Sequence, residues 1–306
     1  MKQYRGRKQK PKQKAHLCLV INSQATGFSQ EKIKELIQAI SQAKIEYSLV
    51  DSSTLKEVSF KIKRCLHKYP TGIIACGGDS TVNMVARHLI RRTTALGIYP
   101  LGKFNNIYRS LHGQPDLERA VEHILSSQNK RIDQGLVAGR VFLGSLGIGL
   151  IPELFQLMEG RRLPRFAIGW SRLAAQAASG IPPREFSLKV DEFAFQISPL
   201  ALNVNLLPYS VGLPLTPSSI SDDGKCEIIF DIGRGQALFS SYIRQIYKRK
   251  YLYSDDIRMY RGTKITIAPT AGQQLYLDGE IIDAPSNELS IEVFPKRVRV
   301  LCKSED

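Results

Sequence analysis

The chain has 306 residues, and its 43 lysines and arginines exceed its 28 aspartates and glutamates by 15 charges. Its hydrophobic fraction of 43% is ordinary for a globular protein, and no apolar run has the ~18 to 20 residues of a membrane span or the position of a signal peptide. The five cysteines are scattered and form no C-x-x-C pair, which argues against a disulfide scaffold or a cysteine-rich zinc site and favours a reducing cytoplasm. The length predicts two domains.

The first 14 residues are strongly basic. Residues 1–14 carry seven lysines and arginines, no acid and no apolar period, so we expect a disordered tail. Three interpretations of this tail stay open: a solvated segment, attraction to anionic lipid, and attraction to nucleic acid.

The next part of the chain alternates between strand and helix patterns. Short apolar runs predict strands at 16–22, 45–50, 72–76 and 95–99. Apolar residues at helical spacing predict helices around 33–40, 54–68, 82–90 and 117–125, the first capped by Ser29. Strands that alternate with helices predict βαβ units, and so an α/β domain with a parallel sheet over residues 15–135.

Residues 136–306 have the pattern of a β-rich domain. Short strand candidates separated by turn residues lie at 186–204, 226–232, 264–268, 288–293 and 298–302. This pattern predicts an antiparallel sandwich or barrel. Two helices, at about 166–179 and 236–249, interrupt it.

The first loop with chemical content lies between the strand at 72–76 and the next helix. It reads Cys-Gly-Gly-Asp-Ser-Thr-Val-Asn over 76–83. Gly77 and Gly78 would let backbone N–H groups approach a phosphate at a helix N-terminus, and Asp79 would suit such a site if it held Mg²⁺. The alternative is a tight turn in which Asp79 or Ser80 caps the helix.

Two further loops carry polar residues. Residues 100–106 (Pro-Leu-Gly-Lys-Phe-Asn-Asn) follow the next strand, so they should emerge at the same sheet edge, where open α/β sheets bind ligands. The alternative there is a plain connection in which Asn106 caps a short helix. The third loop is Leu-Asp-Gly-Glu over 277–280, which by itself is read as a hairpin turn.

The order of these loops, preceded by Asn-Ser-Gln-Ala-Thr-Gly over 22–27, resembles the diacylglycerol kinase catalytic family. That family includes bacterial soluble lipid kinases and sphingosine kinases, and it is distantly similar to NAD kinases. Ser-Asp-Asp-Gly over 221–224 matches a further family segment, and the resemblance covers almost all of 16–302. It implies a Rossmann-like N-terminal domain, a C-terminal β-sandwich, ATP in the cleft between them, and a last strand that packs back on the first domain.

The resemblance also implies roles for single residues. ATP and the catalytic Mg²⁺ would contact Asn22, Ser52, Gly77, Gly78, Asp79, Ser80, Thr81, Asn83, Gly102, Lys103 and Asn105. Glu280, with Asp278 beside it, would be the general base on the lipid hydroxyl. A second, structural Mg²⁺ would bind Asp223 and the main-chain oxygens of Ile220 and Lys225.

The loops also depart from the family pattern. Ser80 replaces a glycine, Met84 a glutamate, and Lys103-Phe104 a Thr-Gly pair. We expect Lys103 to contact the ATP phosphates in place of the lost donors; the alternative is a solvated lysine, and Phe104 is either a lip over the nucleotide or packing. Asp79 and Glu280 are retained, which favours an active enzyme.

The sequence thus predicts an ATP- and Mg²⁺-dependent kinase that acts on diacylglycerol or a similar lipid alcohol. The alternatives are a catalytically impaired nucleotide- or phospholipid-binding paralogue, and a kinase of the NAD kinase type. We expect a cytoplasmic protein that associates peripherally with an anionic membrane and does not bind nucleic acid. Whether it forms a homodimer stays open.

Overall fold

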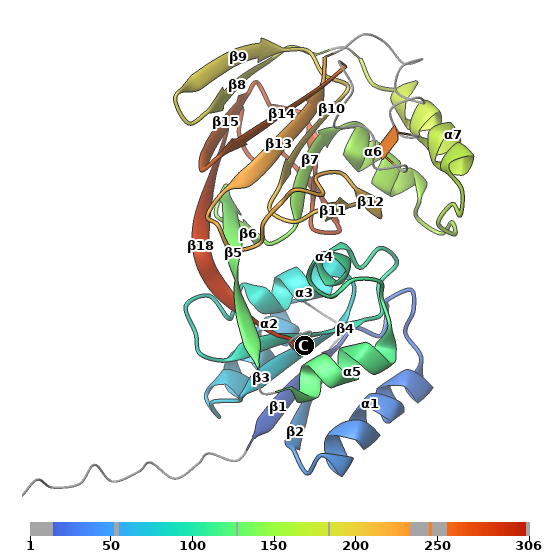
Figure 1. Ribbon diagram of the computed structural model, residues 1–306, viewed down its shortest axis with the longest axis vertical. Coiled ribbons are helices and arrows are strands. Elements are labelled where there is room, and N and C mark those ends of the chain that lie inside the picture. The colour runs from blue at the N-terminus through green and yellow to red at the C-terminus, as the bar shows by residue number, and fades with distance from the viewer. Residues whose placement is uncertain are drawn as a thin grey trace, which may run out of the picture.

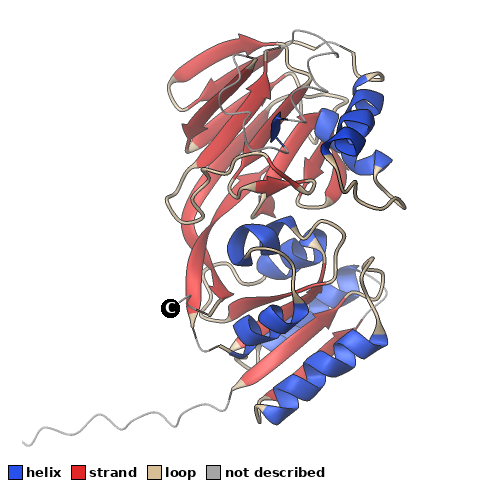
Figure 2. Cartoon of the chain, turned by 45° about the vertical axis from the view of Figure 1, so that its right-hand side comes forward, coloured by secondary structure: helices blue, strands red, loops and turns tan. Residues whose placement is uncertain are grey.

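The structure is a computed structural model that describes residues 15–51, 55–126, 128–182, 184–232, 245–246 and 256–303 (Figure 1). The expected basic tail, Ser52 and most of the helix expected over 236–249 lie outside the described residues. The described chain forms an α/β N-terminal domain and a β-rich C-terminal domain, as expected (Figure 2).

The N-terminal domain is built on a parallel sheet of strand order β2-β1-β3-β4. The apolar runs form its strands, and β3 and β4 are buried along their whole length. Ser29 caps the first helix by accepting a hydrogen bond from the Lys32 N–H at 3.3 Å. The elements are β1 (His16–Ile21), α1 (Gln30–Gln42), β2 (Glu46–Asp51), α2 (Leu55–Leu66), β3 (Gly72–Gly77), α3 (Asp79–Ala86), β4 (Ala95–Pro100), α4 (Asn106–His112) and α5 (Leu117–Leu125).

The C-terminal domain packs two antiparallel layers face to face, so the expected sandwich is confirmed. One layer has the order β14-β13-β10-β7-β16-β17, and the other contains β15, β8 and β9. Their alternating apolar residues, such as Leu188, Ile228 and Ile265, form a buried core between the layers. The strands are β7 (Ser145–Gly149), β8 (Phe186–Val190), β9 (Phe193–Ile197), β10 (Ala201–Asn205), β13 (Cys226–Asp231), β14 (Ile257–Gly262), β15 (Lys264–Ala268), β16 (Gln274–Leu277) and β17 (Glu280–Asp283), with a small hairpin of β11 (Tyr209–Ser210) and β12 (Leu213–Pro214).

One long strand, β18 (Leu289–Leu301), belongs to both domains (Figure 1). It pairs antiparallel with β15 and with β5 (Asn129–Val137), and then lies parallel to β4, where Val300 pairs with Leu96. The strand β5 also pairs with the short β6 (Arg140–Phe142), and the expected boundary at 135/136 falls inside β5. We expected two strands over this length; instead Pro295 sits in a register shift between Phe294 and Val298, where it interrupts no ladder bond.

Two helices pack at the layer that contains β7, β10 and β16. Helix α7 (Ala167–Ala178) matches the helix expected over 166–179, whereas α6 (Leu150–Leu157), which contacts β7, β10 and β16, was not expected. In Figure 2 these helices lie together on one side of the upper domain, above the edge of the parallel sheet. None of the helices in the described ranges combines the length and the apolar character that crossing a membrane requires.

Candidate functional site

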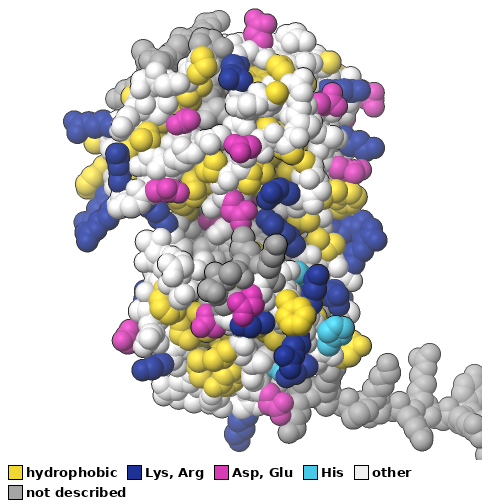
Figure 3. All heavy atoms as spheres, turned by 180° about the vertical axis from the view of Figure 1, so that it is seen from behind, with side chains coloured by type: hydrophobic (Ala, Val, Ile, Leu, Met, Phe, Trp, Pro, Cys, Tyr) yellow, Lys and Arg dark blue, Asp and Glu magenta, His cyan; other side chains and the backbone are white. Residues whose placement is uncertain are grey.

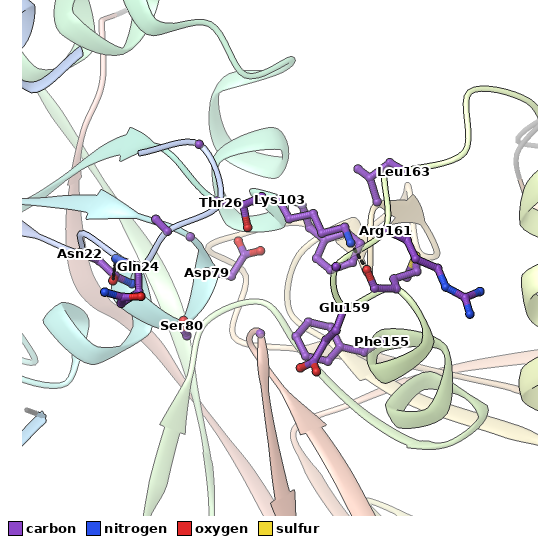
Figure 4. A pocket seen from close by; sticks show the side chains of 18 of the residues that line it. Asn22, Gln24, Thr26, Asp79, Ser80, Lys103, Phe155, Glu159, Arg161 and Leu163 are labelled. Atoms are coloured by element: carbon purple, nitrogen blue, oxygen red, sulfur yellow. Dashed lines mark hydrogen bonds between the residues drawn. The ribbon is translucent and has the colours of Figure 1, made fainter. Parts of the chain in front are cut away.

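A cleft of about 740 Å³ opens where the two domains meet (Figure 4). Loop 22–27, the first turn of α3 and the loop after β4 line it from the N-terminal domain. The end of α6, the loop over 158–163 and Gly279 line it from the C-terminal domain. Its volume lies within the ~300–1,000 Å³ of small-molecule sites, and its first three loops emerge at the carboxyl edge of the parallel sheet.

Glycines let the loops of this cleft pack backbone against backbone. A Cβ on Gly102 would lie 2.3 Å from the Gly78 Cα, and a Cβ on Gly27 would lie 3.0 Å from the Leu101 carbonyl oxygen. The Gly27 N–H donates to that same carbonyl at 2.8 Å. No side chain fits at Gly27, Gly78 or Gly102, so main-chain atoms and the α3 N-terminus face the cleft there, as phosphate binding requires.

Asp79, the first residue of α3, is the acidic group at the floor of the cleft. It is 6% exposed, and its carboxylate accepts hydrogen bonds from the Ile107 N–H at 2.8 Å and from Asn106 Nδ2 at 3.1 Å. Burial raises the pKa of Asp79, while these hydrogen bonds oppose the rise. Gly78 is the N-cap of α3, so neither Asp79 nor Ser80 has the capping role that we weighed.

This carboxylate fits a magnesium–nucleotide complex. Mg²⁺ is usually held by one or two carboxylates, substrate phosphates and water. Asp79 has further acceptor capacity beyond its two hydrogen bonds, and it lines the cleft beside the glycine floor. Among the described residues no group of three or more His, Cys, Asp or Glu could hold a metal ion, so a cation here would depend on ligand phosphates as well.

The two asparagines after β4 organise the second loop. Asn105 adopts the left-handed conformation, with φ of 50°, and its side chain bonds both the N–H and the carbonyl of Gly102, at 2.9 and 2.8 Å. Asn106 was weighed as a helix cap, but Asn105 is the N-cap of α4. The Asn106 side chain instead joins the domains: its Oδ1 accepts from the Gly212 N–H at 2.8 Å, and its Nδ2 donates to the Tyr276 hydroxyl at 3.2 Å.

The Asp278-Gly279 pair forms a two-residue hairpin between β16 and β17. Their φ angles of 46° and 87° suit Asp-Gly in such a turn. A Cβ on Gly279 would lie only 3.2 Å from the Ser80 backbone nitrogen and 3.4 Å from the Asp79 Cβ. The hairpin therefore brings the C-terminal domain into contact with the start of α3, and the turn interpretation is confirmed.

The Asp278 carboxylate is turned into the protein. It accepts hydrogen bonds from the backbone N–H groups of Leu143, Gly144 and Ser145 at 2.6 to 2.9 Å, and it does not line the cleft. Burial raises the pKa of Asp278 to about 7, and the nearby Asp79 adds to the rise, while the three N–H donors oppose it. Asp278 therefore anchors the β16–β17 hairpin to the backbone of residues 143–145.

Glu280 lies at the start of β17, beside the cleft lining and outside it. Its Oε2 is 3.7 Å from Arg87 Nη2, at the end of α3, and its side chain is 29% exposed. Arg87 Nε and Nη2 are buried and have no hydrogen-bond partner among the described residues. Sequence reasoning missed Arg87, because no local motif marks a contact between α3 and a hairpin about 190 residues later.

The Lys103 ammonium is neither solvated nor free to bind a phosphate in this structure, because it already donates a hydrogen bond within the protein. Its Nζ donates a hydrogen bond to the Met158 carbonyl at the end of α6, a bond drawn dashed in Figure 4, and lies 5.7 Å from the centre of the Phe104 ring. Burial lowers the pKa of Lys103, which the nearby Glu159 opposes. Phe104 is packed, with its ring centroid 5.7 Å from that of Phe155.

The expected nucleotide residues separate into two layers. The first lines the cleft: Asn22, Gly78, Asp79, Ser80, Gly102 and Lys103. Gly77, Thr81, Asn83 and Asn105 lie behind it, and Asn22 Nδ2 donates to Thr81 Oγ1 at 2.9 Å. Both amide atoms of Asn83 are buried with no hydrogen-bond partner in the described ranges. Phe155 and loop 158–163 also line the cleft, and no motif in the sequence marks them as part of the site.

The expected second cation site does not fit a metal. Asp223 forms an ion pair with the Arg261 guanidinium, and its other oxygen accepts from the Lys225 N–H at 3.0 Å. Arg261 Nε is also 3.3 Å from Glu227 Oε1, and Ile220 is 49% exposed. A guanidinium therefore already neutralises the carboxylate that the resemblance assigns to a cation, and we derive no metal chemistry there.

Comparison with known proteins gives consistent matches along the chain. The family model described as "Diacylglycerol kinase catalytic domain" matches residues 16–137, and the one described as "YegS C-terminal NAD kinase beta sandwich-like domain" matches residues 149–302. The diacylglycerol kinase of Bacillus subtilis is 24% identical over 258 residues, which cover 82% of this chain and 84% of the relative.

Solved structures share the fold. A diacylglycerol kinase from Bacillus anthracis superposes with a TM-score of 0.71 at 19% identity, covering 96% of this chain and 98% of its own. An NAD kinase from Archaeoglobus fulgidus, solved in complex with ATP, superposes with a TM-score of 0.54 at 12% identity, covering 94% and 93%.

Proposed function

The chain belongs to the diacylglycerol kinase family, and on that premise we propose that it transfers the γ-phosphate of ATP to the hydroxyl of diacylglycerol or a similar lipid alcohol. The observation that carries the proposal is Asp79 on a glycine-lined floor, with the Asp278-Gly279 hairpin of the other domain packed against it. Phosphoryl transfer depends on positioning and charge neutralisation, and this floor offers both.

The nucleotide phosphates would lie on the glycine floor and the α3 N-terminus. Asp79 would hold Mg²⁺ together with phosphate oxygens, and the bound cation would neutralise charge on the transferred group. Asn106 and the Ile107 N–H fix the Asp79 carboxylate through hydrogen bonds of 3.1 and 2.8 Å, so little reorganisation would precede binding. The fold neighbour that was solved with ATP supports a nucleotide at such a site.

Glu280 is the proposed general base. Asp79 and Asp278 are buried, whereas the Glu280 side chain is 29% exposed and lies 3.7 Å from the Arg87 guanidinium. The Glu280 carboxylate would take the proton of the lipid hydroxyl as that oxygen bonds to the γ-phosphorus, while the bond from phosphorus to the β-γ bridging oxygen breaks and leaves ADP.

The surface beside the cleft supports a lipid acceptor. Phe166 and Ile168 are 72% and 62% exposed at the start of α7, close in sequence to Arg161 and Arg162 of the cleft lining. Exposed apolar side chains with adjacent arginines suit the interface of an anionic bilayer, and each well-placed cation is worth ~1 kcal/mol there. We therefore propose that the protein works at such a surface, in contact with the cytoplasm.

The test is transfer of labelled γ-phosphate from ATP to a panel of lipid alcohols in mixed micelles. We expect a labelled lipid, and we expect Asp79→Asn to abolish labelling because a neutral amide binds the cation much more weakly than a carboxylate does. Glu118→Gln, an exposed acid on α5, is the matched control and should keep full activity. If the label is transferred to NAD and to no lipid, a lipid alcohol is the wrong class of acceptor.

A catalytically impaired paralogue is the second candidate. The observation that favours it is that Lys103 and Glu280 already have protein partners, the Met158 carbonyl and Arg87. Binding of ATP by calorimetry, without transfer to any acceptor of the panel, would support this candidate over the kinase.

A further inference from the structure

A second concave site lies at the other end of β4 from the cleft. It is a pocket of about 200 Å³ lined by the connection from α3 to β4, by β5 and by β18. Its lining residues precede β4, whereas the cleft residues 101–106 follow it, so the two sites are separated by the length of that strand. We call it the arginine pocket; it is lined by Arg91, Arg92, Thr93, Arg131, Lys296, Arg297 and Arg299.

Every charged residue of the arginine pocket is a cation. Figure 3, which views the molecule from behind, shows several lysine and arginine side chains near the level where the two domains meet. None of the five arginines has a carboxylate within 4.0 Å in the part of the chain that the structure describes, and Lys296 reaches only Asp222, at 3.5 Å. Positive charge is thus concentrated here, and among the described residues Asp222 is the acid that partly compensates it.

The backbone holds these cations close together. The Arg91 N–H donates to the Arg297 carbonyl at 3.2 Å, with Arg91 in the left-handed conformation at φ of 60°. Arg131 of β5 is the direct cross-strand partner of Arg299 of β18. Like charges directly opposite each other destabilise a sheet, so this register costs free energy unless an anion lies between the two side chains.

One arginine also has an unused donor. Arg299 Nε is buried and has no hydrogen-bond partner among the described residues. A buried donor that loses water without gaining a partner carries a desolvation cost, which a bound acceptor would remove.

We propose that the arginine pocket binds a phosphomonoester group, presented either by a lipid headgroup or by a soluble phosphate compound. Guanidinium groups present paired N–H donors that match phosphate oxygens, and Thr93 adds a hydroxyl. The pocket is smaller than the ~300–1,000 Å³ of whole-ligand sites, which suits a compact headgroup and not an acyl chain. Its concave form favours such a group over the extended backbone of a nucleic acid. The binding does not depend on the kinase reaction.

The decisive variant pairs Arg131→Gln with Arg299→Gln in the full-length chain. Arg64→Gln with Arg119→Gln removes the same charge from two exposed arginines elsewhere and is the matched control. Arg92→Gln, on the other wall of the pocket, is a second variant that does not touch the sheet. Loss of charge-assisted contacts should weaken phosphate binding by at least about tenfold in R131Q/R299Q, and much less in R64Q/R119Q.

Two assays distinguish the source of the phosphate. The first measures the rise in Tm with glycerol 3-phosphate, compared with sodium chloride at matched ionic strength. The second measures sedimentation with phosphatidylcholine vesicles that contain phosphatidic acid, compared with charge-matched phosphatidylserine vesicles. A response sensitive to R131Q/R299Q and to Arg92→Gln supports the proposal, with a soluble source if only the first assay responds and a lipid source if only the second does.

Two results would overturn the proposal. If R131Q/R299Q and R64Q/R119Q behave alike in both assays, the pocket contributes only general positive charge. If duplex RNA binds in a manner sensitive to R131Q/R299Q while neither phosphomonoester probe does, the surface serves nucleic acid. Without ligand, R131Q/R299Q should melt no lower than wild type because it removes the repulsion between opposed arginines, which separates a binding defect from a folding defect.

Discussion

The Asp79 carboxylate is held by Asn106 and Ile107, which follow β4, the strand that pairs with β3. The Gly-Gly-Asp motif after an apolar strand predicts an acidic group at a phosphate-binding edge, and the structure places Asp79 at the floor of the cleft. The hydrogen bonds from Asn106 and the Ile107 N–H that hold Asp79 could not be predicted, because the sequence allows Asn106 to cap its own helix instead. The partners of Glu280 and Asp223, Arg87 and Arg261, are also absent from any local motif.

Glu280→Gln tests the proposed base. Because the amide cannot accept the hydroxyl proton, we expect kcat to fall by ~10² to 10⁴-fold, with ATP affinity unchanged. Steady-state kinetics with ATP and lipid varied separately measure both. Glu288→Gln, an exposed acid beyond β17, should behave as wild type. A variant with full kcat would remove Glu280 from the mechanism.

Asp278 should make stability depend on pH. Its pKa is about 7 in the folded chain, against ~3.9 for an exposed aspartate, so the folded state keeps a proton that the unfolded state loses between those values. The contribution of Asp278 to stability is therefore complete below about pH 4 and is lost as the pH rises to about 7.

Denaturant unfolding from pH 4 to pH 8 measures this effect. Compared with wild type, Asp278→Asn should be less stable at low pH, because its amide cannot accept all three backbone N–H bonds, and the difference should narrow as pH rises. Asp283→Asn, an exposed change on the neighbouring strand, should retain the wild-type pH dependence. Parallel pH curves for wild type and Asp278→Asn would show that Asp278 is ionised throughout.

At the scale of elements, the sequence predicts a helix or strand well when the residues of that element alone carry the defining pattern. Helix α1 has its own apolar stripe and its own cap, Ser29, and both were predicted. Helix α6 was missed because it follows β7 directly and contains Pro152, so its apolar residues continue those of the strand. Strand β18 was predicted in two pieces because Pro295 suggests a break, whereas a bulge accommodates the proline within one strand.

Lys103 links the loop after β4 to the end of α6. Its ammonium lies on the Met158 carbonyl, near the negative end of the α6 dipole, at the edge of the cleft. We expect Lys103→Ala to raise the KM for ATP by about tenfold or more and to change the KM for lipid less, with Lys103→Arg milder. Lys34→Ala, on the exposed face of α1, is the control. An unchanged KM for ATP with a lowered Tm would limit Lys103 to a structural link.

Arg261 of β14 pairs with Asp223, the residue to which the resemblance assigns a structural Mg²⁺. Because its guanidinium already neutralises Asp223, we expect the nucleotide-free wild-type chain to have the same Tm in EDTA as in millimolar MgCl₂. Arg261→Gln should lower the Tm, since it leaves Asp223 and the buried Glu227 without their cation. A magnesium-dependent rise in the wild-type Tm that disappears in Asp223→Asn would show that a metal displaces the arginine.

At the scale of the whole molecule, the two halves of the sequence predict an α/β part and a β-rich part, and the family resemblance implies that the last strand packs back on the first domain, as β18 does. Strand pairing between residues 129–137 and 291–301 is a contact of long sequence separation, and no local pattern reports it. The consequence is that residues 16–137 do not contain a complete sheet. Cut after 137, the chain would leave β4 and β5 without β18, and their unpaired edges would be open to solvent and to other chains.

The place of β18 in the chain also sets an order of events during synthesis. Domains generally fold from the N-terminus as they leave the ribosome. Here β18, which pairs with β4 and β5, begins at Leu289, long after β4 ends at Pro100, so the sheet of the N-terminal domain stays incomplete until β18 has been made. Until then β4 is an exposed edge, and a nascent chain stalled after β17 should need protection by a chaperone.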